Sequence, residues 1–126
     1  MATIGRNVVA FAAWLLVVGT VVQVFLAGLG VFRDPSDFET HRTFGYLLGV
    51  LAIGLLILTV AVRAPRLQVG AIGLVVLGFV LQSILVTFRT STPVIAALHP
   101  VNGFLIVFVS IWFARSAWRL AGRTAL

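Results

Sequence analysis

Long apolar segments alternate with short polar links along this chain. Four segments of about 20 residues or more hold few charged side chains, and they cover residues 7–32, 41–62, 68–88 and 94–119. An α-helix rises about 1.5 Å per residue, so each segment can cross a hydrocarbon layer of about 30 Å. The first segment is too long for the apolar core of a cleavable signal peptide, which has about 7–15 residues. The pattern therefore predicts one all-α domain, a transmembrane bundle of four helices.

One short pattern occurs twice, at the start of the second and of the fourth apolar segment. Pro35 and Pro93 each stand six residues before a histidine, and a glycine follows each histidine by four residues. These histidines, His41 and His99, are the only two in the chain. The repeat predicts two similar helical hairpins in a pseudo-twofold relation about an axis along the membrane normal. Such an axis would make the two histidines face each other.

The composition supports a membrane protein and excludes several kinds of site. Hydrophobic residues make up 61% of the 126 residues and charged residues 10%, whereas a soluble domain is about 25% charged. The chain has no cysteine, which excludes disulfides, iron–sulfur clusters and thiolate catalysis. The net charge is +6. Its nine arginines stand mostly singly at the ends of apolar segments, so we expect a lipid bilayer as the partner and no nucleic acid.

The distribution of charge predicts the orientation in the membrane. The two ends of the chain and the middle link hold six arginines and no acid: Arg6, Arg63, Arg66, Arg115, Arg119 and Arg123. The other two links hold the remaining three arginines and all three acids. The positive-inside rule then places both termini in the cytoplasm, in a cytoplasmic-type membrane. The two histidines would lie near the outer face.

Polar side chains inside the apolar segments gather at the level of the histidines. Gln23 and Gln82 lie in the outer halves of the first and third segments, and Asn102 follows His99 by about one turn. Polar groups are costly inside a membrane and usually indicate a site or a helix contact. We therefore expect a pocket close to the two histidines.

Two facing histidines are suited to binding haem. A neutral imidazole is a good ligand for haem iron, and two of them give a low-spin centre that transfers electrons. Residues four apart share one face of a helix, so Gly45 and Gly49 lie below His41 and Gly103 lies below His99. These glycines would leave room for a flat porphyrin. Close packing of helices at small residues would explain the same glycines without a cofactor.

The charged residues near the histidines suggest how haem B and its iron would be held. The anionic propionates need cationic partners, for which Arg42 is the first candidate, followed by Arg89 and Arg33. Contact with lipid phosphate is the alternative for each of them. A zinc or copper site would need a third or fourth ligand, and Glu39 is the only candidate.

The residues Glu39-Thr40-His41-Arg42 at the head of one helix, with His99 at the head of the next but one, resemble half of haem A synthase. That membrane enzyme consists of two four-helix bundles, each with a histidine pair on its second and fourth helices. The resemblance implies a four-helix bundle with His41 and His99 as axial ligands of a b-type haem. Three features differ: this chain has four helices instead of eight, it lacks the cysteine pair of the first outer loop, and Glu39 precedes His41 by two residues instead of three.

The expected function is that of an integral membrane b-type haem-binding protein, a cytochrome that transfers electrons or carries haem. No catalytic residue is expected, because two protein ligands leave the iron no open position for oxygen. Two alternatives stay open. One is a haem-modifying oxidoreductase related to half of haem A synthase, acting as a homodimer. The other is a structural subunit of a membrane complex without a cofactor. The sequence does not identify a redox partner or a substrate.

Overall fold

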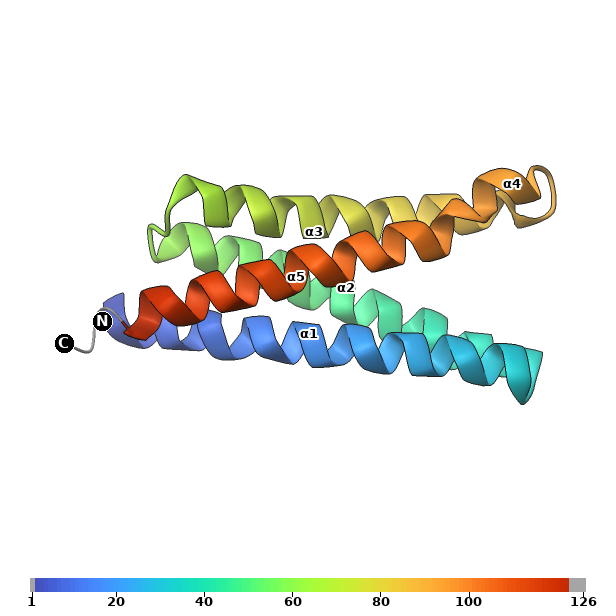
Figure 1. The fold of residues 1–126 in the computed structure, drawn as a ribbon, viewed down its shortest axis with the longest axis horizontal. Coiled ribbons are helices and arrows are strands. Elements are labelled where there is room, and N and C mark those ends of the chain that lie inside the picture. Colours follow the sequence, from blue (N-terminus) through green and yellow to red (C-terminus); the bar gives the residue numbers. More distant parts are fainter. Residues whose placement is uncertain (1, 123–126) are drawn as a thin grey trace.

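The protein forms a bundle of four long helices (Figure 1) in a computed structural model that describes residues 2–122. The long helices are α1 (Ala2–Phe32), α2 (Phe38–Ala61), α3 (Arg66–Leu85) and α5 (Leu98–Gly122). Three short helical pieces lie in the links at one end of the bundle: η1 (Pro35–Asp37), η2 (Val86–Arg89) and α4 (Pro93–Ala96). No strand occurs between residues 2 and 122. The predicted all-α, four-helix fold is confirmed.

The helices run up and down, so that consecutive long helices form two hairpins, α1–α2 and α3–α5. α1 packs mainly against α2 and α5, and α3 packs mainly against the same two helices. α5 runs obliquely through the bundle, beside α1 at the end where the chain begins and beside α3 at the other end (Figure 1). α1 therefore lies apart from α5 at the end that holds η1 and α4.

All four long helices are suited to a membrane. The candidate spans are Thr3–Phe32, Pro35–Ala61, Arg66–Arg89 and Pro93–Gly122, and each is long and apolar enough to cross a bilayer. Large apolar side chains such as Phe25, Val50 and Phe108 are exposed on the outer surface of the bundle. A soluble monomer rarely exposes apolar surface on this scale. By the length and composition of its helices, the chain is an integral membrane protein.

The packed core occupies the part of the bundle away from the histidines. Its buried apolar cluster on α2 reaches only Leu48, and on α5 only Ile106, in the direction of the two histidines. Beyond these residues α5 has one further buried side chain, the polar Asn102, and α2 has none. Fully buried apolar side chains on α2 and α5 thus stop about two turns before the histidines, whereas the partly buried Phe44 packs against the core one turn from His41.

Prolines determine how the two histidine-bearing helices begin. Pro35 opens η1, and the carboxylate of Asp34 caps it by accepting a hydrogen bond from the backbone N–H of Ser36 at 2.8 Å. α2 follows directly and begins at Phe38, three residues before the start expected from the sequence. The apolar segment expected over 94–119 is interrupted between α4 and α5.

Pro100 explains this interruption. A proline has no N–H, and its ring crowds the carbonyl four residues earlier, which here belongs to Ala96, the last residue of α4. The helix therefore stops at Ala96 and begins again at Leu98. Pro100 then lies in the first turn of α5, where a backbone N–H has no partner within the helix in any case.

Candidate functional site

His41 and His99 come together across the two hairpins. Their ring centroids are 6.3 Å apart, and their ring planes meet at 55°. His41 is the fourth residue of α2 and His99 the second residue of α5, and both side chains are half-buried. Each follows a short helical turn that a proline opens, so the repeated unit in the sequence places the two rings in equivalent positions.

Both imidazoles are held in the same way by the preceding helix. His41 Nδ1 is 3.1 Å from the backbone oxygen of Gln23, and His99 Nδ1 is 3.1 Å from the backbone oxygen of Gln82. A carbonyl oxygen can only accept, so Nδ1 is the protonated nitrogen of each ring and Nε2 carries the lone pair. Metal-binding histidines commonly donate their other N–H to a carbonyl in this manner, which orients the ring.

The two glutamine side chains lie in one layer with the histidines but bond differently. Gln23 Nε2 donates to the backbone oxygen of His41 at 2.7 Å and lies 3.5 Å from Nε2 of the same residue. Gln23 Oε1 is buried and finds no hydrogen-bond partner among residues 2–122. Gln82 Oε1 accepts from Asn102 Nδ2 at 2.7 Å, and this amide also donates to the backbone oxygen of Gly78 at 2.9 Å.

The glycines beside the histidines make room for these amides. A Cβ on Gly45 would lie 2.7 Å from Gln23 Nε2, and a Cβ on Gly103 would lie 3.4 Å from Gln82 Nε2. A Cβ on Gly49 would meet the side chain of Phe79 at 3.8 Å, an ordinary contact. The space next to Gly45 and Gly103 is thus taken by glutamine side chains here. That these glycines leave room for a porphyrin stays a prediction.

Two of the acidic residues near the site, Asp37 and Glu39, are paired with arginines. Arg42 pairs with Glu39, and Arg33 donates two hydrogen bonds to Asp37, at 2.6 and 2.7 Å. The Asp37 carboxylate raises the pKa of Arg33. Arg89, at the end of η2, makes no ion pair within the part of the chain described. Arg89 is therefore the one of the three candidate propionate partners whose guanidinium is not already paired.

Glu39 does not join the two histidines as a metal ligand. Its carboxylate bonds Arg42. Among residues 2–122 no three His, Cys, Asp or Glu side chains come close enough together to hold a metal ion. The site thus offers two protein nitrogen ligands.

One neighbour of the histidine pair was not identified from the sequence. The Phe38 ring meets His41 edge to face, with centroids 6.2 Å apart and planes at 89°. The ring lies against Gly30, where a Cβ would come within 2.7 Å of it. Phe38 stands three residues before His41 on the same helix face, a spacing that could have indicated it. The two backbone carbonyls that hold the imidazoles leave no signal in the sequence.

Comparison with known proteins gives a family and no function. No curated protein and no solved structure matches the chain significantly. A family model described as "Family of unknown function (DUF6220)" matches residues 23–90. The match begins at Gln23, includes His41 and α3, and ends before His99. Because these residues are more than half of the chain, the protein belongs to the DUF6220 family.

Proposed function

We propose that this protein binds one haem B between its two hairpins, with His41 and His99 as the axial ligands of the iron. It would serve as a small b-type cytochrome that transfers electrons or carries haem. The observation that supports this proposal most is the histidine pair itself. Its two rings come from different hairpins, face each other, and each uses Nδ1 on a backbone carbonyl.

The distance between the rings fits two imidazoles on opposite sides of one metal ion. A histidine nitrogen binds a transition metal at about 2.0–2.1 Å, and the ring centre lies about 1.1 Å beyond that nitrogen, so two such ligands have ring centres about 6.2 Å apart. The observed distance is 6.3 Å. The lone pair on each Nε2 is the donor that such binding requires.

The kind and number of donors also favour haem over a bare metal ion. Structural zinc takes four protein ligands and catalytic zinc three, whereas the site offers two. A porphyrin supplies the remaining four nitrogen ligands of an iron itself. When bound, haem supplies one-electron redox chemistry. Two protein ligands would leave oxygen no open position, so this site suits electron transfer better than oxygen activation.

The surroundings support the same proposal. The fully buried apolar side chains of α2 and α5 end about two turns before the histidines. Arg89, which is unpaired within the described residues, is available at the same end for an anionic propionate. Among the described residues, five arginines and no acid lie at the opposite end, which favours a cytoplasmic location for that end. The haem would then lie near the outer face.

A cofactor-free structural subunit is the second candidate. It is favoured by the observation that two backbone carbonyls already bond Nδ1 of both histidines, and that the Gln23 amide lies against His41. The resemblance to half of haem A synthase supports a third, enzymatic candidate. Haem modification would need one histidine to leave the iron, or a second tetrapyrrole, for example between two copies of the chain.

Titration of the detergent-purified protein with haem B tests the proposal. We expect saturation at one haem per chain, with a low-spin spectrum and a pyridine extract typical of haem B. A Gln68→Leu variant is the matched control, because it removes a buried amide that bonds Ser116 far from the histidines. It should bind haem like the wild type. A chain that takes up no haem would favour the structural candidate.

A further inference from the structure

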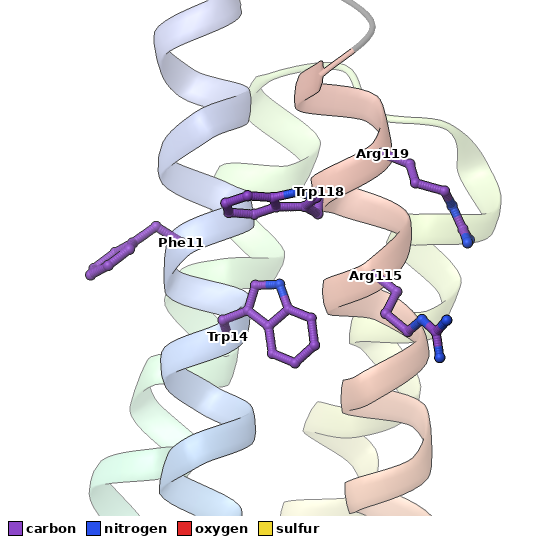
Figure 2. Close-up of a pocket in the computed structure, with 5 residues that line it drawn as sticks. All are labelled: Phe11, Trp14, Arg115, Trp118 and Arg119. Carbon is purple, nitrogen blue, oxygen red and sulfur yellow. The ribbon is translucent and has the colours of Figure 1, made fainter.

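A groove opens on the surface between α1 and α5, at the end of the bundle opposite the histidines. Its volume is about 660 Å³, within the range of ligand sites in proteins. Five side chains line it: Phe11 and Trp14 from α1, and Arg115, Trp118 and Arg119 from α5. Figure 2 shows the two indole rings between α1 and α5, whereas both arginine side chains extend from the other side of α5.

The groove follows from the residues at the seam. The buried side chains of both helices at this level are largely alanines, among them Ala10, Ala13, Ala114 and Ala117. Short side chains let two helices approach closely. The aromatic side chains of Phe11, Trp14 and Trp118 lie outside this packed seam and form the walls of the groove. Trp118 is 62% exposed and Trp14 37%.

The arginines of the groove have no acidic partner among the residues that the structure describes. Arg115 and Arg119 are four residues apart and thus share one face of α5. The three acids of the chain, Asp34, Asp37 and Glu39, all lie at the other end of the bundle. Neither guanidinium makes an ion pair within residues 2–122. Two adjacent unpaired guanidiniums attract an anion with several oxygens, such as a phosphate.

The position of the groove determines what that anion can be. Phe11 and Trp14 lie inside the candidate span Thr3–Phe32, and the arginines lie in the last two turns of α5. Tryptophan and arginine at this level are typical of the interface between hydrocarbon and headgroups. A ligand here would have its charged part at the headgroup level and an apolar part along the aromatic walls.

We propose that this groove binds an anionic phospholipid. The headgroup phosphate is held by Arg115 and Arg119, and an acyl chain lies in the apolar groove between Trp14 and Trp118. The site is independent of haem binding, because it lies at the other end of the bundle. The lipid in this groove would stay bound to the protein, unlike the lipids that surround any membrane protein and exchange freely.

Native mass spectrometry of the protein in detergent tests this, with phosphatidylglycerol and phosphatidylcholine as probes. We expect the wild type to retain one phosphatidylglycerol and to prefer it over phosphatidylcholine. Arg115→Gln/Arg119→Gln should weaken phosphatidylglycerol binding by about tenfold or more, since each cation near a headgroup contributes about 1 kcal/mol. Arg115→Lys/Arg119→Lys should retain most of the binding.

Arg63→Gln/Arg66→Gln is the matched control, because it removes the same charge from the same end of the bundle but outside the groove. We expect it to bind phosphatidylglycerol within about threefold of the wild type, because exposed charges that do not contact the headgroup are largely screened by salt. Equal loss in both glutamine pairs would show a general charge effect and would overturn the proposal. A wild type that does not distinguish the two lipids would overturn it as well. Circular dichroism of each variant verifies that the bundle is folded.

Discussion

At the scale of single residues, Gly45 and Gly103 occupy equivalent places in the two hairpins but are not equally crowded. A side chain on Gly45 would collide with the amide of Gln23, which bonds the backbone of His41. A side chain on Gly103 would only touch the amide of Gln82, which is held by Asn102. The same substitution, glycine to alanine, should therefore displace a neighbouring side chain at Gly45 but not at Gly103.

We predict that Gly45→Ala is less stable than Gly103→Ala by about 1–2 kcal/mol in free energy of unfolding. Both changes gain a similar amount of helix propensity, whereas only the first displaces a glutamine amide and removes its hydrogen bond. Thermal unfolding of the two variants in one detergent measures the difference. Equal stability would mean that the Gln23 amide can move aside without loss.

The arginines near the site also differ from each other, because Arg42 is paired with Glu39 and Arg89 makes no ion pair within the described residues. We predict that Arg89→Gln speeds the loss of bound haem by about tenfold, the effect of removing one charged hydrogen bond. Arg42→Gln is the matched control and should have a smaller effect, since Arg42 is paired with Glu39. Transfer of haem to apomyoglobin gives both rates. A larger effect at Arg42 would restore the order expected from the sequence, in which Arg42 came first.

At the scale of elements, the short turns η1 and α4 precede the two histidines and determine where each histidine lies along the bundle. The η1 turn depends on the Asp34 carboxylate, which accepts a hydrogen bond from Ser36. This bond lowers the pKa of Asp34 below its ordinary value. A carboxyl with a lowered pKa in the folded state stabilises that state above its unfolded pKa, and the contribution disappears as the pH falls through the lowered value.

We therefore predict that the η1 cap persists at neutral pH and is lost only below about pH 3.9, the ordinary pKa of aspartate. The amide resonance of Ser36, followed by NMR between pH 7 and pH 2, reports this loss. Asp34→Asn keeps an oxygen acceptor that does not titrate, so its Ser36 resonance should not show this transition. A midpoint above 3.9 in the wild type would contradict the assigned hydrogen bond.

At the scale of the whole molecule, the uneven distribution of arginines and acids between the two ends of the bundle predicts its orientation in the membrane. The chain has no cysteine, so single cysteines can be placed freely. We predict that Ser36→Cys and Ser91→Cys react with an impermeant maleimide added outside intact cells, whereas Thr3→Cys reacts only after the cells are opened. The opposite pattern would place the histidines at the cytoplasmic face. Labelling of all three from outside would contradict a bundle whose first residues lie on the opposite side of the membrane from both links.

The length and apolar character of the four segments were sufficient to predict the four helices, because an isolated apolar segment of this length crosses a bilayer as a helix. The repeated proline and histidine also predicted which residues of the two hairpins correspond. The interruption before Leu98 was harder to locate, since Pro100 can bend or break a helix according to where the helix begins. The hydrogen bonds from His41 and His99 to backbone carbonyls could not be predicted, because every residue has such a carbonyl. The pairing of Arg42 with Glu39 could not be predicted either, because each of these charged side chains has several possible partners nearby.

The central claim is that His41 and His99 together bind one haem, and the absorption spectrum of the dithionite-reduced protein tests it most directly. The wild type should show a sharp low-spin α-band at near one haem per chain. His41→Ala and His99→Ala should each lose this band, because either change removes one of the two axial ligands. Gln68→Leu should keep it. A low-spin band that survives in either histidine variant would contradict the account, as would a wild-type protein that stays colourless after addition of haem.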